Sequence, residues 1–404
     1  MARLGGGGGD EPATVNRKGS YLGSAVLCLA GACSDTSGPS SDGPGPFASL
    51  SAGANPCALT PAGALYCWGA DLYGLIPTKL TLPAGLSFTS VTAGNYHNCG
   101  LAPSGAAYCW GGNDEGRLGD GTTTGRSAPV PVVMPSGVSF ASLALAVGPY
   151  GTHTCGLTTA GAAYCWGGND TGQLGDGTTT GRLTPGAVAT PAGVTFTSLS
   201  AGGQHTCGLT PAGTVYCWGD NEQGGQLGDG TTIDRLLPTA VVMPAGVSFA
   251  SLSVRGYHSC GLTSGAAAYC WGWNRGQVGD GTATDRLTPT AVVMPAGVSF
   301  TTLAAGYDQT CALTPAGAAY CWGRNGSGQV GDGTMTMPGQ PHRTMPVAVV
   351  MPPGVTFASL APGWAYACAL TAAGAAYCWG ANHNGQLGDG TTETRLIPVK
   401  VVQQ

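Results

Sequence analysis

The tetrapeptide Tyr-Cys-Trp-Gly recurs seven times in this chain and constrains its fold more than any other feature. Successive tryptophans of the copies are 42 to 57 residues apart. Periods of about 40–50 residues are typical of propellers and solenoids rather than of helical bundles. We therefore expect seven repeat units from about Phe47 onward, instead of two or three ordinary domains. The copies are Tyr66–Gly69, Tyr108–Gly111, Tyr164–Gly167, Tyr216–Gly219, Tyr269–Gly272, Tyr320–Gly323 and Tyr377–Gly380.

Cysteine spacing adds a second constraint. Fourteen of the sixteen cysteines form seven pairs that are ten residues apart. This pattern predicts disulfides and an oxidising compartment, and the alternative is a set of buried free thiols that act as small hydrophobic side chains. No Cys-x-x-Cys or paired-histidine motif points to zinc. The predicted disulfides are Cys57 with Cys67, Cys99 with Cys109, Cys155 with Cys165, Cys207 with Cys217, Cys260 with Cys270, Cys311 with Cys321, and Cys368 with Cys378.

Within one unit, the two cysteines flank a short loop. Cys155 and Cys165 are equidistant from Ala160, so a hairpin with a three-residue turn places them directly opposite each other. Alternation along the strands then puts Tyr164 and Trp166 on the other face of the sheet. The third turn residue needs a positive φ, which glycine adopts readily. The glycines expected there are Gly63, Gly105, Gly161, Gly213, Gly265, Gly317 and Gly374.

A long loop follows six of the seven tetrapeptides and ends in Asp-Gly, a turn signal. An arginine stands six residues after the aspartate in five of these loops, which predicts an ion pair that holds the loop. The sixth loop carries an insertion, so its Asp332 is expected to pair with Arg343. The five regular pairs are Asp120 with Arg126, Asp176 with Arg182, Asp229 with Arg235, Asp280 with Arg286, and Asp389 with Arg395.

The Gly-Gln-Leu-Gly loop, the Ala-Gly-x-x-His-Thr-Cys-x-Leu-Thr strand and the Tyr-x-Trp-Gly strand together resemble the regulator of chromosome condensation repeat. The resemblance covers about residues 47–402. It implies an all-β fold, a seven-bladed β-propeller of four-stranded antiparallel blades. We expect the C-terminal strand, Ile397 to Val402, to join the first blade and close the ring. Nuclear members of the family act as nucleotide exchange factors and bind chromatin, roles that fit poorly with export and paired cysteines.

The N-terminal segment predicts export. Arg17 and Lys18 precede an apolar run from Tyr21 to Ala32, which has the length of a signal-peptide core. Cys33 follows it in an imperfect bacterial lipoprotein box and is the expected lipidation site. We therefore divide the chain into an export segment (1–33), a Ser/Gly/Pro tether (34–46) and the propeller (47–404). The expected location is the outer surface or the periplasm, where the protein would be held as a lipoprotein. The alternatives are that the protein is secreted without a lipid anchor, or that the apolar stretch occurs by chance.

Metal, cofactor and catalytic sites find little support in the sequence. Four histidines share one repeat position, where hydrogen bonding between repeats explains them better than a metal: His97, His153, His205 and His258. The Asp-Gly loops lack the alternating acidic ligands of an EF-hand. No catalytic set stands outside the repeat pattern, so we expect no enzyme activity, metal or cofactor. With 9% charged residues and a net charge of −5, the chain lacks the excess of basic residues that is typical of nucleic-acid-binding proteins.

One group of aromatic residues departs from the repeated pattern. These residues fall just before the first cysteine of five units, among neighbours that vary. Aromatic side chains in variable loops of a rigid scaffold are typical of protein-binding surfaces, although they could also merely pack between loops. We predict a monomeric scaffold that binds a protein or surface polymer at one mouth of the ring. The alternatives are an extracellular polysaccharide-acting enzyme and a structural envelope module. The candidate contacts are Tyr96, Tyr150, Tyr257, Tyr307, Trp364 and Tyr366.

Overall fold

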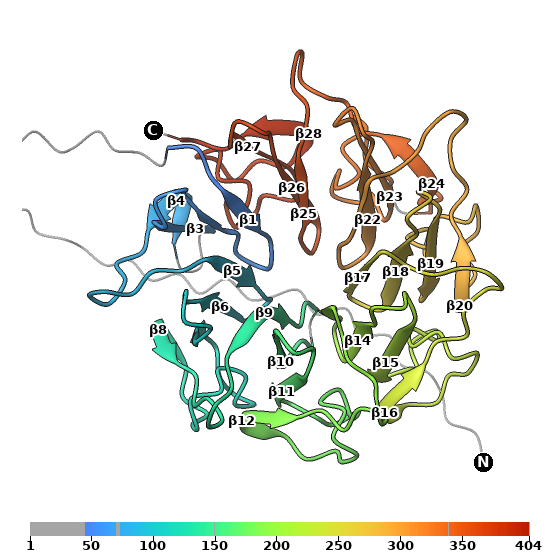
Figure 1. The fold of residues 1–404 in the computed structure, drawn as a ribbon. Coiled ribbons are helices and arrows are strands. Elements are labelled where there is room, and N and C mark those ends of the chain that lie inside the picture. The colour runs from blue at the N-terminus through green and yellow to red at the C-terminus, as the bar shows by residue number, and fades with distance from the viewer. Residues whose placement is uncertain (1–44, 70–72, 149, 338, 404) are drawn as a thin grey trace, which may run out of the picture. The chain divides into compact units, whose positions relative to one another are not determined.

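The computed structural model describes residues 45–69, 73–148, 150–337 and 339–403. The predicted export segment with Cys33, and most of the tether, lie outside these residues, so lipidation and the proposed division of the chain stay predictions. Across the described residues, 28 strands and no helices form seven four-stranded antiparallel sheets. The sheets follow one another around a ring (Figure 1). The predicted all-β, seven-bladed propeller is confirmed.

Each blade consists of four consecutive strands. The first three blades are β1–β4 (Ser49–Ser51, Cys57–Leu59, Leu65–Gly69, Gly74–Lys79), β5–β8 (Ser90–Ala93, His97–Leu101, Ala107–Gly111, Arg126–Pro131) and β9–β12 (Phe140–Leu145, His153–Thr158, Ala163–Gly167, Arg182–Ala187). Blades four and five are β13–β16 (Ser198–Ala201, His205–Leu209, Val215–Gly219, Arg235–Ala240) and β17–β20 (Ser251–Arg255, His258–Leu262, Ala268–Gly272, Arg286–Ala291). Blades six and seven are β21–β24 (Thr302–Ala305, Gln309–Leu313, Ala319–Gly323, Arg343–Ala348) and β25–β28 (Ser359–Pro362, Tyr366–Leu370, Ala376–Gly380, Arg395–Lys400).

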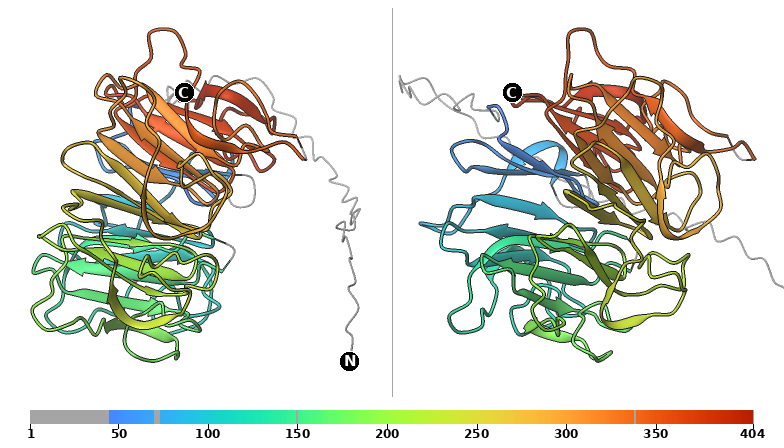
Figure 2. Two further views of the ribbon diagram at one scale, coloured as in Figure 1. Left: turned by 90° about the vertical axis from the view of Figure 1, so that its right-hand side faces the viewer. Right: turned by 45° about the vertical axis from the view of Figure 1, so that its right-hand side comes forward.

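The strand order places all variable loops at one end of the ring. The first strands of successive blades lie beside one another and are therefore the innermost strands. Because the pairing is antiparallel, the loop between the first and second strands and the long loop between the third and fourth emerge at the same end. We call this end the loop mouth. Figure 2 shows the ring from two further directions.

The hairpin of each blade has the register expected from the spacing of ten. Cys155 pairs with Cys165, and Thr154 lies opposite Trp166. The face with the cysteines packs against the next blade, whose Trp218 is fully buried in the same cluster. Burial of large aromatic side chains between sheets stabilises such blade-to-blade packing.

All seven cysteine pairs form disulfides, rather than remaining free thiols. The two Cα atoms are 4.1 Å apart in each pair, a separation that follows from direct opposition of the two residues across the hairpin. Every one of the fourteen side chains is fully buried. The bonds join Cys57 with Cys67, Cys99 with Cys109, Cys155 with Cys165, Cys207 with Cys217, Cys260 with Cys270, Cys311 with Cys321, and Cys368 with Cys378.

The long loop of each blade reaches the next blade. Trp166 of the third blade donates its indole N–H to the carbonyl of Arg117 in the second blade's loop, at 2.9 Å. Farther along that loop, Gly121 donates its backbone N–H to Leu183 on the outer strand of the third blade, at 3.0 Å. The loop therefore fastens the interface and covers part of an exposed sheet edge.

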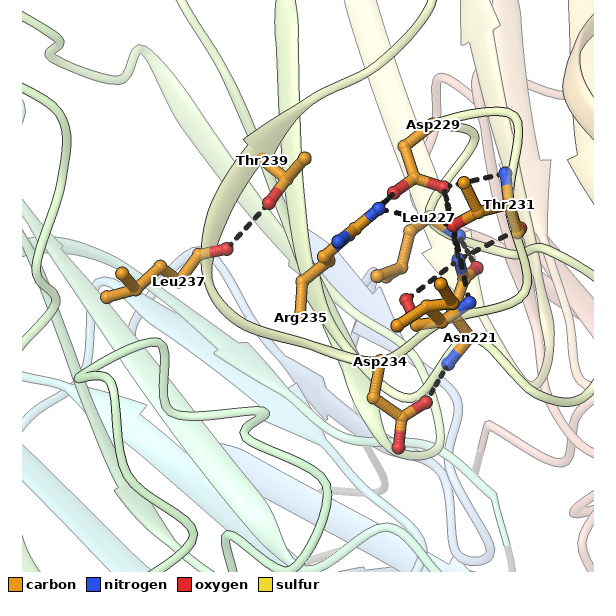
Figure 3. Close-up of polar contacts among 9 residues, drawn as sticks. Asn221, Leu227, Asp229, Thr231, Asp234, Arg235, Leu237 and Thr239 are labelled. Atoms are coloured by element: carbon orange, nitrogen blue, oxygen red, sulfur yellow. Dashed lines mark hydrogen bonds and ion pairs between the residues drawn. The ribbon is translucent and has the colours of Figure 1, made fainter.

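The Asp-Gly turn is held by a compact set of polar contacts. In the fourth blade, one oxygen of Asp229 accepts from the Arg235 guanidinium at 2.7 Å. The other accepts from the Thr231 hydroxyl at 2.7 Å and from the Asn221 amide at 3.2 Å (Figure 3). Since each aspartate is nearly buried, these contacts fix the loop that reaches the next blade. Ion pairs join Asp120 with Arg126, Asp176 with Arg182, Asp229 with Arg235, Asp280 with Arg286, Asp332 with Arg343, and Asp389 with Arg395.

The predicted mode of ring closure is wrong. The C-terminal strand β28 pairs with β27 in the last blade, and the first blade takes its own outer strand, β4, from Gly74–Lys79. The ring closes through the same contact that joins other blades, because Trp68 donates its indole N–H to the Gln386 carbonyl at 3.0 Å. Phe47 adds a backbone bond to Gly374 at 2.9 Å. Since the outer strand follows the tetrapeptide in every unit, no strand has to be exchanged.

One turn also differs from the expected pattern. In six hairpins the predicted glycine has a positive φ, between 76° and 80°. In the fifth blade, Ala266 has a φ of 66° instead, and Gly265 stands one position earlier. The hairpin geometry requires a left-handed residue at a fixed position, whatever the residue type. An alanine here therefore carries backbone strain that its six counterparts avoid.

Candidate binding site at the loop mouth

Below the loop mouth, the four repeat histidines bridge neighbouring blades. Each imidazole Nε2 lies near a hydroxyl of the following blade: His97 near Thr154 (2.6 Å), His153 near Thr206 (2.9 Å), His205 near Ser259 (3.2 Å) and His258 near Thr310 (2.8 Å). In the sixth blade Gln309 takes this position and donates to the Tyr366 carbonyl at 2.9 Å. The histidines thus make hydrogen bonds between repeats.

The hydrogen-bond chain determines which imidazole nitrogen carries the proton. Thr206 donates its only hydroxyl hydrogen to the Gln173 carbonyl, at 3.0 Å. The hydroxyl must therefore accept from Nε2–H of His153, which leaves Nδ1 of His153 unprotonated and without a partner. Burial lowers the pKa of His153, His205 and His258 to about 3, because the interior cannot solvate a charged ring. These rings are neutral at physiological pH.

Above this layer, loop aromatics from the fifth to the seventh blade form a continuous row. Tyr257 makes an edge contact with Trp273, with ring centroids 6.1 Å apart, and another with Tyr307 at 5.9 Å. Tyr307 contacts Trp364 at 5.1 Å. We call these four residues the aromatic row. Edge and tilted contacts of this kind hold aromatic rings in defined positions.

A cavity of about 330 Å³ continues from the end of the row at Trp364. It lies at the junction of the last, first and second blades, and Tyr96 lines it together with Trp364. Both residues are substantially exposed, Tyr96 by 45% and Trp364 by 37%. Asn95 lines the same cavity and is nearly buried, and its Oδ1 has no hydrogen-bond partner. The cavity therefore offers aromatic surface beside a polar group, which is common in ligand sites.

The six candidate residues fall into different environments. Tyr96 and Trp364 face the cavity, and Tyr150 is the most exposed of the six at 58%. Tyr257 and Tyr307 lie in the aromatic row, where Tyr257 is almost buried. Tyr366 starts strand β26, occupies the histidine position and donates its hydroxyl to the Gly53 carbonyl at 2.9 Å. With 1% exposure it belongs to the interface between blades, although the residue is also among those that line the cavity.

Charged residues at the loop mouth support the aromatic rings. The Arg117 guanidinium lies 5.2 Å from the Tyr96 ring centre, and that of Arg275 lies 4.7 Å from Trp273. Both distances are typical of cation–π contacts. Burial raises the pKa of Asp308, although its ion pair with Arg324 at 3.0 Å works in the opposite direction.

Sequence reasoning missed the roles of Trp273, Arg117 and Arg275. Trp273 directly follows the fifth tetrapeptide, so its position outside the structural set was a usable signal. Arg117 replaces a glutamine that stands at this loop position in the other five long loops, which was also a usable signal, whereas Arg275 lies at a position where the residue type varies. Within the described ranges, no group of three or more His, Cys, Asp or Glu residues could hold a metal ion. No helix in this part of the chain could cross a membrane.

Comparison with known proteins agrees with this architecture. The family profile described as the RCC1-like domain matches residues 75–404. The chain belongs to the RCC1-like domain family. It is 31% identical over 367 residues to the ultraviolet-B receptor UVR8 of Arabidopsis thaliana, covering 88% of this chain and 81% of that protein. It is 30% identical to the human E3 ubiquitin-protein ligase HERC2 over 70% of this chain, but that match spans only 6% of HERC2.

Two solved structures share the fold. The crystal structure of Prp20p from Saccharomyces cerevisiae superposes with a TM-score of 0.72 at 22% identity, covering 88% of this chain and 87% of that one. Human WBSCR16 superposes with a TM-score of 0.69 at 20% identity, covering 81% and 85% of the two chains. At these identities the likeness concerns the fold alone.

Proposed function

We propose that this propeller is a non-enzymatic, exported scaffold that binds a protein or a surface polymer at the loop mouth. The observation that carries the proposal is the aromatic row, which leads into the cavity between Trp364 and Tyr96. Rigid aromatic side chains supply contact area at low entropic cost and dominate many binding surfaces. The loops that hold them are anchored to a disulfide-linked scaffold, so little order has to be gained on binding.

Two further observations support the proposal. Seven disulfides suit an oxidising, extracellular environment. Yeast RCC1 (Prp20), which has a similar fold, has been solved bound to Kap60, so a protein with this fold can bind another protein. Neither observation names the partner of this chain.

The test is a comparison of mouth variants against a matched control. The full-length oxidised protein serves as bait for surface extracts of the source organism, and every captured partner is then titrated against purified variants. Trp364→Ala and Tyr96→Ala should each weaken binding at least about tenfold, which corresponds to about 1.4 kcal/mol. Val242→Ala removes an exposed apolar side chain from the end of the ring away from the loop mouth and should leave binding unchanged.

Two results would count against this function. If every captured partner binds the mouth variants as tightly as the wild type, the aromatic row serves only to pack the loops. If no partner binds saturably, the propeller is a structural module of the envelope. Retention of the wild-type unfolding midpoint in both mouth variants is the control for folding.

A further inference from the structure

Arg255 occupies a position that is glycine in most of the other blades. It ends the innermost strand of the fifth blade and pairs with His258. Gly94, Gly202 and Gly306 hold the equivalent position and donate to the residue that corresponds to His258. A side chain at Gly202 or Gly306 would collide with the ring of His205 or the amide of Gln309. Among the blades whose loop between the first and second strands has this arrangement, only the fifth carries a long side chain at this position, and that side chain points toward the ring axis.

The Arg255 side chain crosses the ring. Its Nη1 donates to the carbonyl of Pro362 in the last blade, at 2.9 Å, and to that of Ala52 in the first blade. Neither blade is a neighbour of the fifth. The next residue, Gly256, donates its backbone N–H to Val147 in the third blade at 3.1 Å. The guanidinium therefore links the fifth blade to the last and first blades, and the adjacent backbone adds a bond to the third.

The charge of Arg255 is not balanced by a carboxylate in the described part of the chain. No acidic residue there forms an ion pair with it, and its Nε and Nη2 have no hydrogen-bond partner among the same residues. Desolvation lowers the pKa of Arg255 to about 10, so the side chain still carries its charge at neutral pH. A partly buried cation that is bound only by two neutral carbonyls favours a nearby anion.

Arg255 also lines a cavity of about 140 Å³ between the innermost strands. This volume is several times the roughly 30 Å³ that one water occupies in the liquid. Its other walls include Thr92, Leu143, Ser200 and Val254, and none of the described residues that line it is acidic. The Ser200 hydroxyl is already bonded to the backbone of Val254, at 2.9 and 3.2 Å. Among these lining residues, Arg255 is thus the one charged group available to a ligand.

We propose that the central cavity binds a small oxyanion, a carboxylate or a phosphate, through the Nε and Nη2 edge of Arg255. That edge presents two parallel N–H donors, which match two oxygens of such an anion in a bidentate arrangement. The two carbonyls that hold Nη1 fix the direction of the guanidinium, so the ion meets an already oriented donor pair. The site is separate from the aromatic row and does not depend on a partner at the loop mouth.

The test measures anion binding by the full-length oxidised protein. Acetate and inorganic phosphate are titrated separately by calorimetry at constant ionic strength, with chloride as the balancing ion. We expect one equivalent of at least one of them to bind the wild type and the dissociation constant to rise at least tenfold in Arg255→Gln. Lys79→Gln removes one positive charge from an exposed strand position and should bind like the wild type. The anion that binds more tightly identifies the chemistry that the cavity prefers.

Clear outcomes would overturn the proposal. Arg255 has only a structural role between blades if neither anion binds the wild type up to 100-millimolar concentrations. The same conclusion follows if Arg255→Gln binds the anion as tightly as the wild type does. Should Arg255→Gln fail to fold, Arg255→Lys keeps the charge but loses the two-donor edge, and it should bind more weakly than the wild type. In addition, the Nε–H resonance of Arg255 in wild-type protein should shift on saturation with the anion, and an unchanged resonance would contradict the assignment.

Discussion

The neutral histidines between blades predict a steep loss of stability in mild acid. His153, His205 and His258 have native pKa values of about 3, whereas an unfolded histidine titrates near 6.5. Between these values the unfolded chain binds protons that the native state does not. The stabilisation is therefore complete above about pH 6.5 and falls as the pH drops toward 3. Physically, protonation would place a cation between two blades with only a hydroxyl to receive it.

The size of the effect follows from proton linkage. Going from pH 7 to pH 5, one such histidine lowers the free energy of unfolding by about 2 kcal/mol, and three lower it by about 6 kcal/mol. Replacing histidine by glutamine removes the titration, and Gln309 already makes the equivalent contact between the sixth and seventh blades. The triple variant His153→Gln, His205→Gln, His258→Gln should therefore lose about 6 kcal/mol less than the wild type over this range.

The assay is urea unfolding followed by tryptophan fluorescence at pH 7 and pH 5, with disulfides intact and ionic strength constant. Taking the difference between the two pH values within each protein cancels any constant cost of the substitutions. Subtracting the variant's difference from that of the wild type then cancels the contribution of the carboxylates, which both proteins share. His205→Gln alone should remove about one third of the difference. The reasoning is refuted if the triple variant and the wild type lose equal stability, or if proton NMR shows these imidazoles titrating near 6.5 in the native protein.

Three further predictions concern stability. Exchanging Gly265→Ala and Ala266→Gly restores the turn of the other hairpins and should raise the free energy of unfolding by about 1 kcal/mol, while Gly265→Ala alone should not give this gain. Tyr73→Phe removes the hydroxyl that accepts from the Trp110 indole at 3.1 Å and should cost about 1 kcal/mol in urea unfolding; no cost would mean that water replaces the hydroxyl. Asp229→Ala removes an acceptor shared by four donor groups and should cost about 2 kcal/mol, with faster proteolysis of its loop; unchanged cleavage would contradict the anchoring role.

Features within one hairpin were predictable from the sequence. The ten-residue spacing of Cys155 and Cys165 set their pairing, because a short antiparallel hairpin permits few registers. The same alternation placed Trp166 on the face opposite the cysteines. The Ala266 turn shows the limit of this reasoning, since a shifted glycine looks like a regular one when only residue types are aligned.

Contacts between units were harder to predict. The first unit lacks the long loop, and Tyr73 takes over the contact with Trp110 that a loop carbonyl makes elsewhere. Ring closure was predicted wrongly because the C-terminal strand, Ile397 to Val402, was assigned to the first unit of the chain. The strand belongs to the unit it follows.

At the candidate site, the sequence identified which aromatic residues need an explanation but not how they meet. Tyr307 and Trp364 are neighbours because their loops emerge from adjacent blades, whereas the similar-looking Tyr366 is turned into the interface between blades.

The sequence by itself thus determined the number of blades, the hairpin register and the disulfides, because these depend on spacing within a few dozen residues. The tertiary structure alone decided what surrounds the ring axis. Arg255 contacts carbonyls 107 and 203 residues away in the chain, and such contacts exist only because seven twisted sheets close on themselves. No local sequence pattern predicts these contacts. Arg255 is a single residue at a position that is glycine in most other blades, and its partners lie on the opposite side of the ring.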